Sequence, residues 1–383
     1  MNWRIMIGPI LLLVFAVAAY FWGSLRELGL KASLGSAAVS TIPKDAIIPV
    51  VPTLPAAPLA QNLVQGIAEN LNVPWELVWL PDGSLLVTER PGTLVRVSPS
   101  GQRTTIPFPG QVTQVSESGL LGMALDPEFS QNQFIYFYHT TGQGASLRNR
   151  VVRYQLNNDA LANETIILDN IPAGNFHDGG RIKFGPDNLL YIATGDAGQE
   201  NLAQDLRSSA GKILRVEEGG VVRTISSGHR NVQGLAWDST GNLWATEHGR
   251  SGIQSGFDEL NLIQAEQDYG WPNLEGDEQQ DGFVSPIIHS GASETWAPSG
   301  AAFANGSIFF AGLRGETLYE AKLSGTQVVE FKRHFAGEFG RLRTVNIGPD
   351  GALYLLTNNT DGRGTPKEGD DKIIRIDPAA LGE

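Results

Sequence analysis

The feature that most constrains the fold is a unit that recurs six times between residue 62 and the C-terminus. In each unit a turn rich in Pro, Asp, Asn or Gly precedes a short apolar run typical of a buried strand. The turns are Pro81-Asp82-Gly83, Asp126-Pro127-Glu128, Pro186-Asp187-Asn188, Asp238-Ser239-Thr240-Gly241, Asn305-Gly306 and Pro349-Asp350-Gly351. Another apolar strand precedes most of the turns, and a third follows several of them, as at 94–97 and 213–216.

Sheets of three or four short strands cannot bury their faces alone, so repeated sheets pack side by side and close into a ring. The repeat therefore predicts an all-β fold, a six-bladed β-propeller over residues 62–383, with its ligand site on the loops at one end of the central channel. A β-sandwich is the alternative, because its turns also recur about every 8–12 residues. Six matched units are too regular for a sandwich.

Composition narrows the class of function. The chain of 383 residues carries a net charge of -13 and contains no cysteine. Nucleic-acid binding requires a basic surface, so we expect no nucleic-acid partner. The lack of cysteine removes disulfides, thiolate metal sites and cysteine nucleophiles together.

The N-terminal segment has a different character from the repeats. An uncharged run extends from Ile5 to about Leu25 and includes Tyr20-Phe21-Trp22 near its end, as at a membrane interface. A helix of this length spans the ~30 Å hydrocarbon layer, whereas the apolar core of a signal peptide has about 7–15 residues. We expect a signal anchor or transmembrane helix at residues 1–30 and a Pro/Ala-rich linker at 31–61. A cleaved signal peptide is one alternative, and a buried core helix is the other. An anchor or a cleaved signal would place the domain in the cell envelope, at the periplasmic or extracellular face, or outside the cell.

Two loops carry the side chains best suited to chemistry. His177 precedes two glycines at the entrance to a strand, and Arg230 and Asn231 lie on a glycine-flanked loop about fifty residues later. A histidine base on one loop and a fixed cation on the next would form a redox or acid–base site. The alternatives are a structural histidine and an Arg230 that pairs with a surface carboxylate.

Oxygen-rich segments suggest a metal. Glu247-His248-Gly249-Arg250 and Asp258-Glu259-Leu260-Asn261 offer carboxylate, amide and carbonyl oxygens, which suit Ca²⁺. Zinc is less consistent with these segments, because His229 and His248 lack the close spacing of zinc ligands. Asp258 and Glu259 would alternatively cap a turn.

Basic residues occur near the ends of the later repeats. Alternation places Arg341 and Arg343 on the same side of an extended segment, and Arg314 lies between two glycines. Two guanidinium groups on one side would bind a polycarboxylate. Solvated surface charge is the alternative for each of them.

Together these motifs resemble one family over nearly all of residues 65–377, the quinoprotein glucose/sorbosone dehydrogenases, or soluble aldose sugar dehydrogenases. The motifs that carry the resemblance include Thr88-Glu89-Arg90-Pro91-Gly92, Gly119-Leu120-Leu121-Gly122, His177-x-Gly179-Gly180-Arg181, Gly195-Asp196, Gly228-His229-Arg230-Asn231-x-Gln233-Gly234, Glu247-His248-Gly249, Asp258-Glu259-Leu260-Asn261 and Arg341-x-Arg343. The resemblance implies a six-bladed propeller that binds pyrroloquinoline quinone (PQQ) and Ca²⁺. It implies an aldose sugar as substrate and an electron acceptor in the envelope as partner.

The resemblance also implies roles for individual residues. The histidine matching His177 is the general base for the C1 hydroxyl of the sugar, whose hydride passes to the quinone C5. Arg230 and Asn231 match the pair that faces the C5 oxygen and the cofactor rim. The remaining matched positions contact the metal or the cofactor: the Ca²⁺-binding carbonyls of Gly249 and Arg250, the carboxylate-binding Arg314, Arg341 and Arg343, and Glu117 beside the cofactor.

Four positions differ from the usual family pattern. Phe176 replaces Asp or Asn before the catalytic histidine, Glu117 replaces Gln, Arg250 replaces Pro and Arg314 replaces Lys. Two other functions are therefore open: a non-catalytic propeller that binds a ligand or protein, and a Ca²⁺-dependent propeller lactonase.

Overall fold

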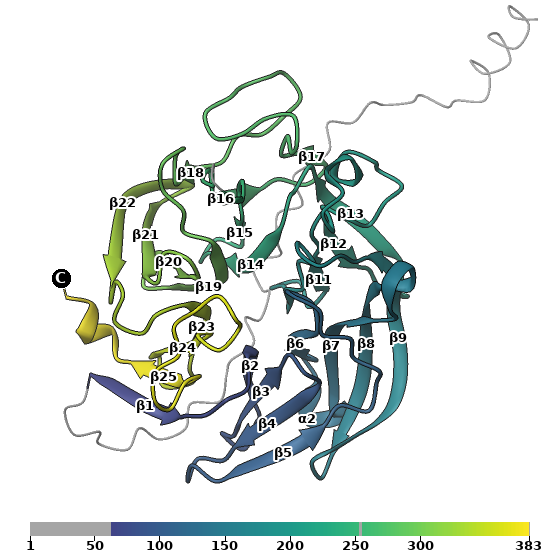
Figure 1. Ribbon diagram of the computed structural model, residues 1–383, viewed down its shortest axis with the longest axis vertical. Coiled ribbons are helices and arrows are strands. Elements are labelled where there is room, and N and C mark those ends of the chain that lie inside the picture. Colours follow the sequence, from purple (N-terminus) through teal and green to yellow (C-terminus); the bar gives the residue numbers. More distant parts are fainter. Residues whose placement is uncertain (1–62, 253–254, 383) are drawn as a thin grey trace, which may run out of the picture. The chain divides into compact units, whose positions relative to one another are not determined.

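The computed structural model describes residues 63–252 and 255–382. The predicted anchor at 1–30 and the linker at 31–61 lie outside the described residues. Within the described ranges no helix is both long and apolar enough to cross a membrane. The described chain forms six mainly antiparallel sheets arranged around one axis (Figure 1), which is the predicted six-bladed β-propeller.

Each blade contains four main strands, and the first four blades follow chain order. Blade 1 contains β2 (Pro74–Trp79), β3 (Leu85–Glu89), β4 (Thr93–Val97) and β5 (Arg103–Pro107). Blade 2 contains β6 (Leu120–Leu125), β7 (Phe134–Thr141), β8 (Arg148–Asn157) and β9 (Ala160–Pro172). Blade 3 contains β10 (Ile182–Phe184), β11 (Leu190–Ala193), β12 (Ile213–Val216) and β13 (Val222–Ser227), with the short β17 (Gln267–Asp268) added in parallel. Blade 4 contains β14 (Val232–Trp237), β15 (Leu243–Glu247), β16 (Glu259–Ile263) and β18 (Ile288–His289).

The last two blades and the short helices complete the described part of the chain. Blade 5 contains β19 (Pro298–Ala304), β20 (Ser307–Gly312), β21 (Leu318–Ser324) and β22 (Gln327–His334). Blade 6 contains β23 (Leu342–Ile347), β24 (Leu353–Thr357), β25 (Ile373–Ile376) and β1 (Val64–Ala68). The short helical segments with described bounds lie in connections or after the last strand: α2 (Phe129–Asn132), η1 (Gly144–Ser146), η2 (Glu200–Ala203) and η4 (Pro378–Leu381).

The six repeated turns join the first and second strands of the six blades. In five of them an aspartate side chain accepts a backbone N–H two residues later, as Asp82 does from Ser84 at 2.9 Å and Asp350 from Ala352 at 3.2 Å. In the sixth turn Asn305 and Gly306 both have positive φ, as a two-residue hairpin turn requires. The repeat seen in the sequence is therefore a repeat of local turn chemistry.

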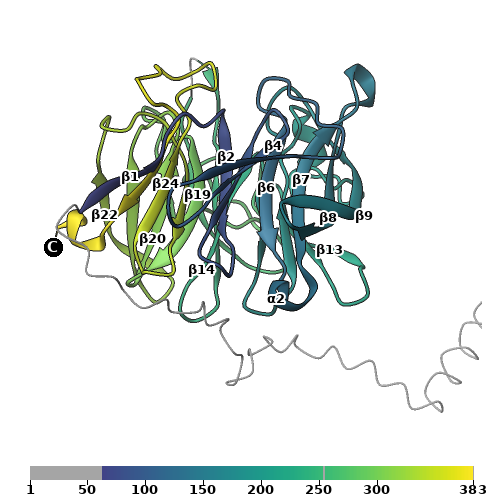
Figure 2. The ribbon, with the colours of Figure 1, turned by 90° about the horizontal axis from the view of Figure 1, so that it is seen from below.

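The ring is closed by strands from opposite ends of the described chain. β1 pairs antiparallel with β25, with Val64 opposite Ile376, so the first strand completes the last blade (Figure 2). Six apolar clusters combine residues of neighbouring blades; in one of them Leu86 of blade 1 packs with Phe137 of blade 2. The core thus lies between the blades, and the loops above it are free to carry the site.

Candidate active site

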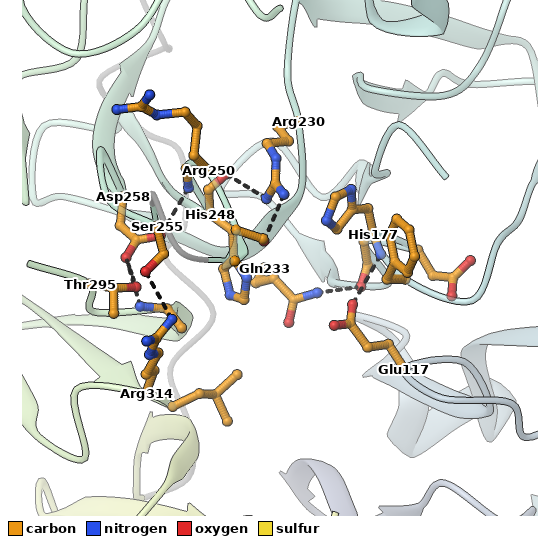
Figure 3. A pocket seen from close by; sticks show the side chains of 18 of the residues that line it. Glu117, His177, Arg230, Gln233, His248, Arg250, Ser255, Asp258, Thr295 and Arg314 are labelled. Atoms are coloured by element: carbon orange, nitrogen blue, oxygen red, sulfur yellow. Dashed lines mark hydrogen bonds between the residues drawn. The ribbon is translucent and has the colours of Figure 1, made fainter. Parts of the chain in front are cut away.

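A cavity of about 750 Å³ opens among the loops at one end of the propeller, opposite the six repeated turns. Its wall includes residues of the β5–β6, β9–β10 and β13–β14 connections between blades. It also includes residues of the β15–β16, β20–β21 and β24–β25 connections within blades. In Figure 3, Glu117 and His177 lie on one side of this pocket, and Ser255, Asp258 and Arg314 lie on the other. The predicted place of the ligand site is therefore a real cavity.

His177 projects from the β9–β10 loop with its backbone in the left-handed region, at φ 63°. Gly195 makes this position accessible, because a Cβ there would lie 1.9 Å from the His177 carbonyl oxygen. The Nδ1 atom of His177 lies 2.8 Å from Oδ1 of the fully buried Asp196. A carboxylate accepts hydrogen bonds, so in the neutral ring Nδ1 carries the proton and Nε2 keeps its lone pair.

Asp196 is itself fixed by two further donors. Its Oδ1 accepts the Gly198 N–H at 2.7 Å, and its Oδ2 accepts the indole N–H of Trp271 at 3.0 Å. The same indole ring lies under the Arg230 guanidinium, 5.2 Å from Cζ to the ring centroid. Asp196 and Trp271 therefore connect the His177 loop to the Arg230 loop.

Arg230 lines the same cavity from the β13–β14 loop. Its Nη2 donates to the Ser251 hydroxyl at 2.8 Å, and its backbone N–H donates to Glu247. Burial lowers the pKa of Arg230, and the nearby Asp196 and Glu117 raise it. Its Nε has no hydrogen-bond partner among the described residues, so this buried cation has an unused donor.

Asn231 is fully buried and is not among the residues that line the cavity. Its Oδ1 accepts the Gly179 N–H at 3.0 Å, which fastens the His177 loop to the next blade. The Nδ2 of Asn231 has no partner among the described residues. The hydrogen bond between Asn231 and Gly179 thus positions the loop that carries His177, the predicted base.

The other predicted arginines also lie in the cavity wall, with different partners. Arg314 donates to the Ser255 hydroxyl at 2.8 Å, and Arg341 forms an ion pair with Asp361 at 2.9 Å. Arg343 donates to two amide oxygens, those of Gln233 at 2.7 Å and Asn358 at 3.1 Å. Burial lowers the pKa of Arg343 to about 9, so the side chain stays cationic near neutral pH.

Gly249 and Arg250 line the cavity on the β15–β16 loop. The Gly249 N–H donates to Asp258 at 2.9 Å, and a Cβ on Gly249 would lie 2.2 Å from the Gly256 carbonyl oxygen. The other oxygen of Asp258 accepts the Thr295 hydroxyl and two backbone N–H groups. Within the described ranges no group of three or more His, Cys, Asp or Glu side chains could hold a metal. A cation here would depend on backbone carbonyls.

Glu117 and Phe176, two of the positions that differ from the family pattern, flank His177. Oε2 of Glu117 accepts the His177 N–H at 3.0 Å. The Phe176 ring is 46% exposed and meets the His177 ring edge-on at 4.8 Å between centroids. His229, the other histidine considered for zinc, is fully buried between Ser226 and Glu247, which is a structural arrangement.

Comparison with known proteins identifies the chain's relatives. A family model described as glucose/sorbosone dehydrogenase matches residues 71–374. The chain belongs to the glucose/sorbosone dehydrogenase family. The aldose sugar dehydrogenase YliI of Escherichia coli is 31% identical over 80% of this chain and 92% of its own length. Quinoprotein glucose dehydrogenase B of Acinetobacter calcoaceticus is 31% identical over 69% of this chain and 64% of its own.

The solved structures agree with the sequence comparison. The PQQ-bound aldose sugar dehydrogenase of Streptomyces coelicolor is 40% identical and has a TM-score of 0.77, covering 84% of this chain and 99% of that one. The family predicted from the motifs and the six-bladed propeller are thereby confirmed. The match makes this chain a member of a dehydrogenase family.

Sequence reasoning missed several residues of the site of this dehydrogenase-family protein. Asp196 belongs to the Gly195-Asp196 motif, and its position three residues after the buried strand β11 was the available signal. Burial lowers the pKa of His248, in the cavity wall, to about 4, so its ring is neutral. Trp271 and Arg363 also line the cavity. No local pattern marks Arg363, because its partner Glu117 is 246 residues away in the sequence.

Proposed function

We propose that this protein is a PQQ- and Ca²⁺-dependent dehydrogenase that oxidises the C1 hydroxyl of aldose sugars to lactones. The observation that carries the proposal is the convergence in one cavity of an imidazole oriented by a buried carboxylate, His177 with Asp196, and cations with unused donors. When bound, PQQ would supply the two-electron acceptor for the C1 hydride.

The donor set suits a polycarboxylate such as PQQ. Among the described residues Arg314 and Arg343 form no ion pair, and the Nε atoms of Arg230, Arg341 and Arg343 have no hydrogen-bond partner. Arg343 is a buried cation without a counter-ion, which is unfavourable, so an anionic ligand would stabilise this arrangement. Arg314, Arg341 and Arg343 would bind the carboxylates, with Arg230 near the reacting end.

The loop that ends at Asp258 would hold the cation. The carbonyls of Gly249 and Arg250 are hard oxygen donors, which Ca²⁺ prefers. Asp258 fixes the backbone of this loop through the Gly249 N–H. Because Ca²⁺ takes about 6–8 oxygen ligands, cofactor and water oxygens would complete the coordination.

His177 would act as the general base. With Nδ1 bonded to Asp196, Nε2 is free to take the proton of the sugar C1 hydroxyl. The Asp196 carboxylate would stabilise the imidazolium that results, and it would hold the ring in one orientation throughout. Arg230, fixed by Ser251 and Trp271, would stabilise negative charge beside the reacting carbon.

Reconstitution tests the proposal directly. The purified propeller is incubated with PQQ and Ca²⁺, and sugar oxidation is followed with a redox dye, with parallel samples lacking each component. Sugar-dependent dye reduction that requires both components is the expected result. Lactone hydrolysis without PQQ would instead indicate the Ca²⁺-dependent lactonase, and ligand binding without either activity would indicate a non-catalytic propeller.

We also propose that the domain works in the cell envelope, held by residues 1–30, and passes its electrons to an acceptor there. The support is the apolar run from Ile5 to about Leu25 in the sequence. Membrane fractionation of the full-length protein, compared with a version that begins at residue 62, tests the anchor. Equal release of the two versions into the soluble fraction would contradict it.

A further inference from the structure

Glu117 places a carboxylate in the wall of a cavity whose proposed cofactor is a polyanion. Its side chain is 22% exposed, and it accepts the His177 N–H at 3.0 Å. Burial raises the pKa of Glu117, but the Arg363 charge and the bond from His177 outweigh burial and hold the pKa at about 2. The group is therefore anionic near neutral pH, and on its own it would repel carboxylates.

Arg363 is the cation that faces Glu117. It comes from the β24–β25 loop of blade 6, and its Nη1 lies 2.5 Å from Oε1 of Glu117 on the β5–β6 loop. The loop position of Arg363 is fixed by its backbone N–H, which donates to Asp361 at 2.8 Å. Both members of the pair line the cavity.

The two oxygens of Glu117 therefore have separate tasks. Oε2 holds the backbone of His177, the predicted base, in its left-handed conformation, and Oε1 binds Arg363. A glutamine could make the first contact only through its oxygen, without adding a charge. The chain that carries glutamate here also carries an arginine within reach of it.

We infer that Arg363 is an affinity-determining residue for the anionic cofactor: it neutralises Glu117, which can then hold the His177 loop without repelling the ligand. This inference rests on the proposed function. Exposed ion pairs usually contribute little to stability. Here the effect is expected in ligand affinity, because removing Arg363 leaves a largely buried anion in the cavity wall without its ion-pair partner.

A double-mutant cycle tests the inference. The affinity of the full chain for PQQ is measured by quenching of tryptophan fluorescence, at saturating Ca²⁺ and low ionic strength. The proteins are wild type, Arg363→Gln, Glu117→Gln and the double variant, with Arg363→Lys to keep the charge. We expect Arg363→Gln to bind on the order of tenfold more weakly. Removal of Glu117 should cancel that loss, so the double variant should match Glu117→Gln within about twofold.

A matched control is available outside the cavity. Arg333 has a side chain 51% exposed, against 50% for Arg363, and it also pairs with a glutamate, Glu294 at 2.8 Å. Arg333→Gln should leave PQQ affinity unchanged, and Arg363→Lys should retain most of it. Thermal unfolding of each variant without ligand checks that the fold is intact.

The possible failures are distinguishable. Wild-type binding with unchanged affinity in Arg363→Gln would overturn this inference alone. An equal loss in Arg363→Gln whether or not Glu117 is present would also overturn it, because Arg363 would then act on the ligand directly. Absence of PQQ binding by the wild-type protein would overturn the proposed function and this inference with it.

Discussion

Replacing Asp196 by Asn changes the hydrogen bonds that orient His177 while it keeps the shape of the side chain. The three groups bonded to Asp196 are all donors: His177 Nδ1 at 2.8 Å, Gly198 N at 2.7 Å and Trp271 Nε1 at 3.0 Å. An amide of the same shape must present its NH₂ group to at least one of them. If that group faces His177, the ring must carry its proton on Nε2, the atom that is needed as the base.

Two effects add in this variant. A hydrogen bond to a charged group contributes about 1.5–3 kcal/mol, and loss of that stabilisation from the forming imidazolium slows the reaction about 10- to 150-fold. The wrong tautomer then reduces the fraction of competent enzyme. We expect kcat to fall at least about a hundredfold, within the range of about 10²–10⁴ for general bases. PQQ affinity should change little, because Asp196 is not among the residues that line the cavity.

The assay is the single-turnover bleaching of the quinone absorbance after sugar is mixed with PQQ-loaded protein, so product release does not mask the chemical step. Asp205→Asn is the control, because Asp205 pairs with the exposed Arg207 and does not line the cavity. It should react at the wild-type rate. A rate for Asp196→Asn within about threefold of wild type, with PQQ bound, would refute the role given to the carboxylate.

Three further predictions follow. His177→Ala should lower dye reduction by about 10²–10⁴-fold while PQQ stays bound, and unchanged turnover would rule out His177 as the base. Gly249→Ala places a Cβ 2.2 Å from the Gly256 carbonyl oxygen, so the Ca²⁺ concentration for half-maximal reconstitution should rise about tenfold or more. Gly66→Ala is the control: its Cβ meets open space, so it should leave that concentration unchanged. The pKa of Glu117 is held at about 2 in the folded protein, below its usual value of 4.5, so its stabilising contribution is present above pH 4.5 and is lost as the pH falls toward 2. The difference between the unfolding free energies at pH 6 and pH 3.5 should therefore be smaller in Glu117→Gln than in wild type. The reduction should be part of the maximum of about 3 kcal/mol that the full pKa shift allows, and equal differences in the two proteins would contradict the pairing.

The parts of the fold that could be predicted are those specified locally. Asp187 accepts the Leu189 N–H at 3.1 Å, a contact between residues two apart, and equivalent turns mark the start of each second strand. The outer strands could not be placed, because they carry little apolar pattern: in β5 (Arg103–Pro107) only Ile106 is buried. The pairing of Val64 with Ile376 depends on closure of the whole ring, which no short segment encodes.

The site residues also divide into those that the local sequence marks and those whose contacts depend on the whole fold. His177 and Arg230 could be singled out because glycine-rich loops mark them in the sequence, and both line the cavity. Asp196 and Arg363 were not assigned roles, because their contacts depend on how separate loops meet above the ring. Asn231 matches a cofactor-contact position of the family, and its bond to Gly179 shows a positioning contact that spacing alone does not reveal.

Two buried arginines near the propeller axis show why the cavity above them suits an anion. Arg181 and Arg343 both lie by the ring of Trp75, with Cζ 4.1 and 5.7 Å from its centroid. Arg181 is neutralised by the buried Glu76, so it completes the packing of the channel. Arg343 has only amide and hydroxyl oxygens as partners among the described residues, although burying a cation is costly. Arg181 has a carboxylate partner, whereas Arg343, which lines the cavity, has only neutral partners. The positive charge of Arg343 therefore stays available for a ligand. An anion bound there would complete the electrostatic balance of the fold, and that is why a polycarboxylate cofactor is the ligand the geometry favours.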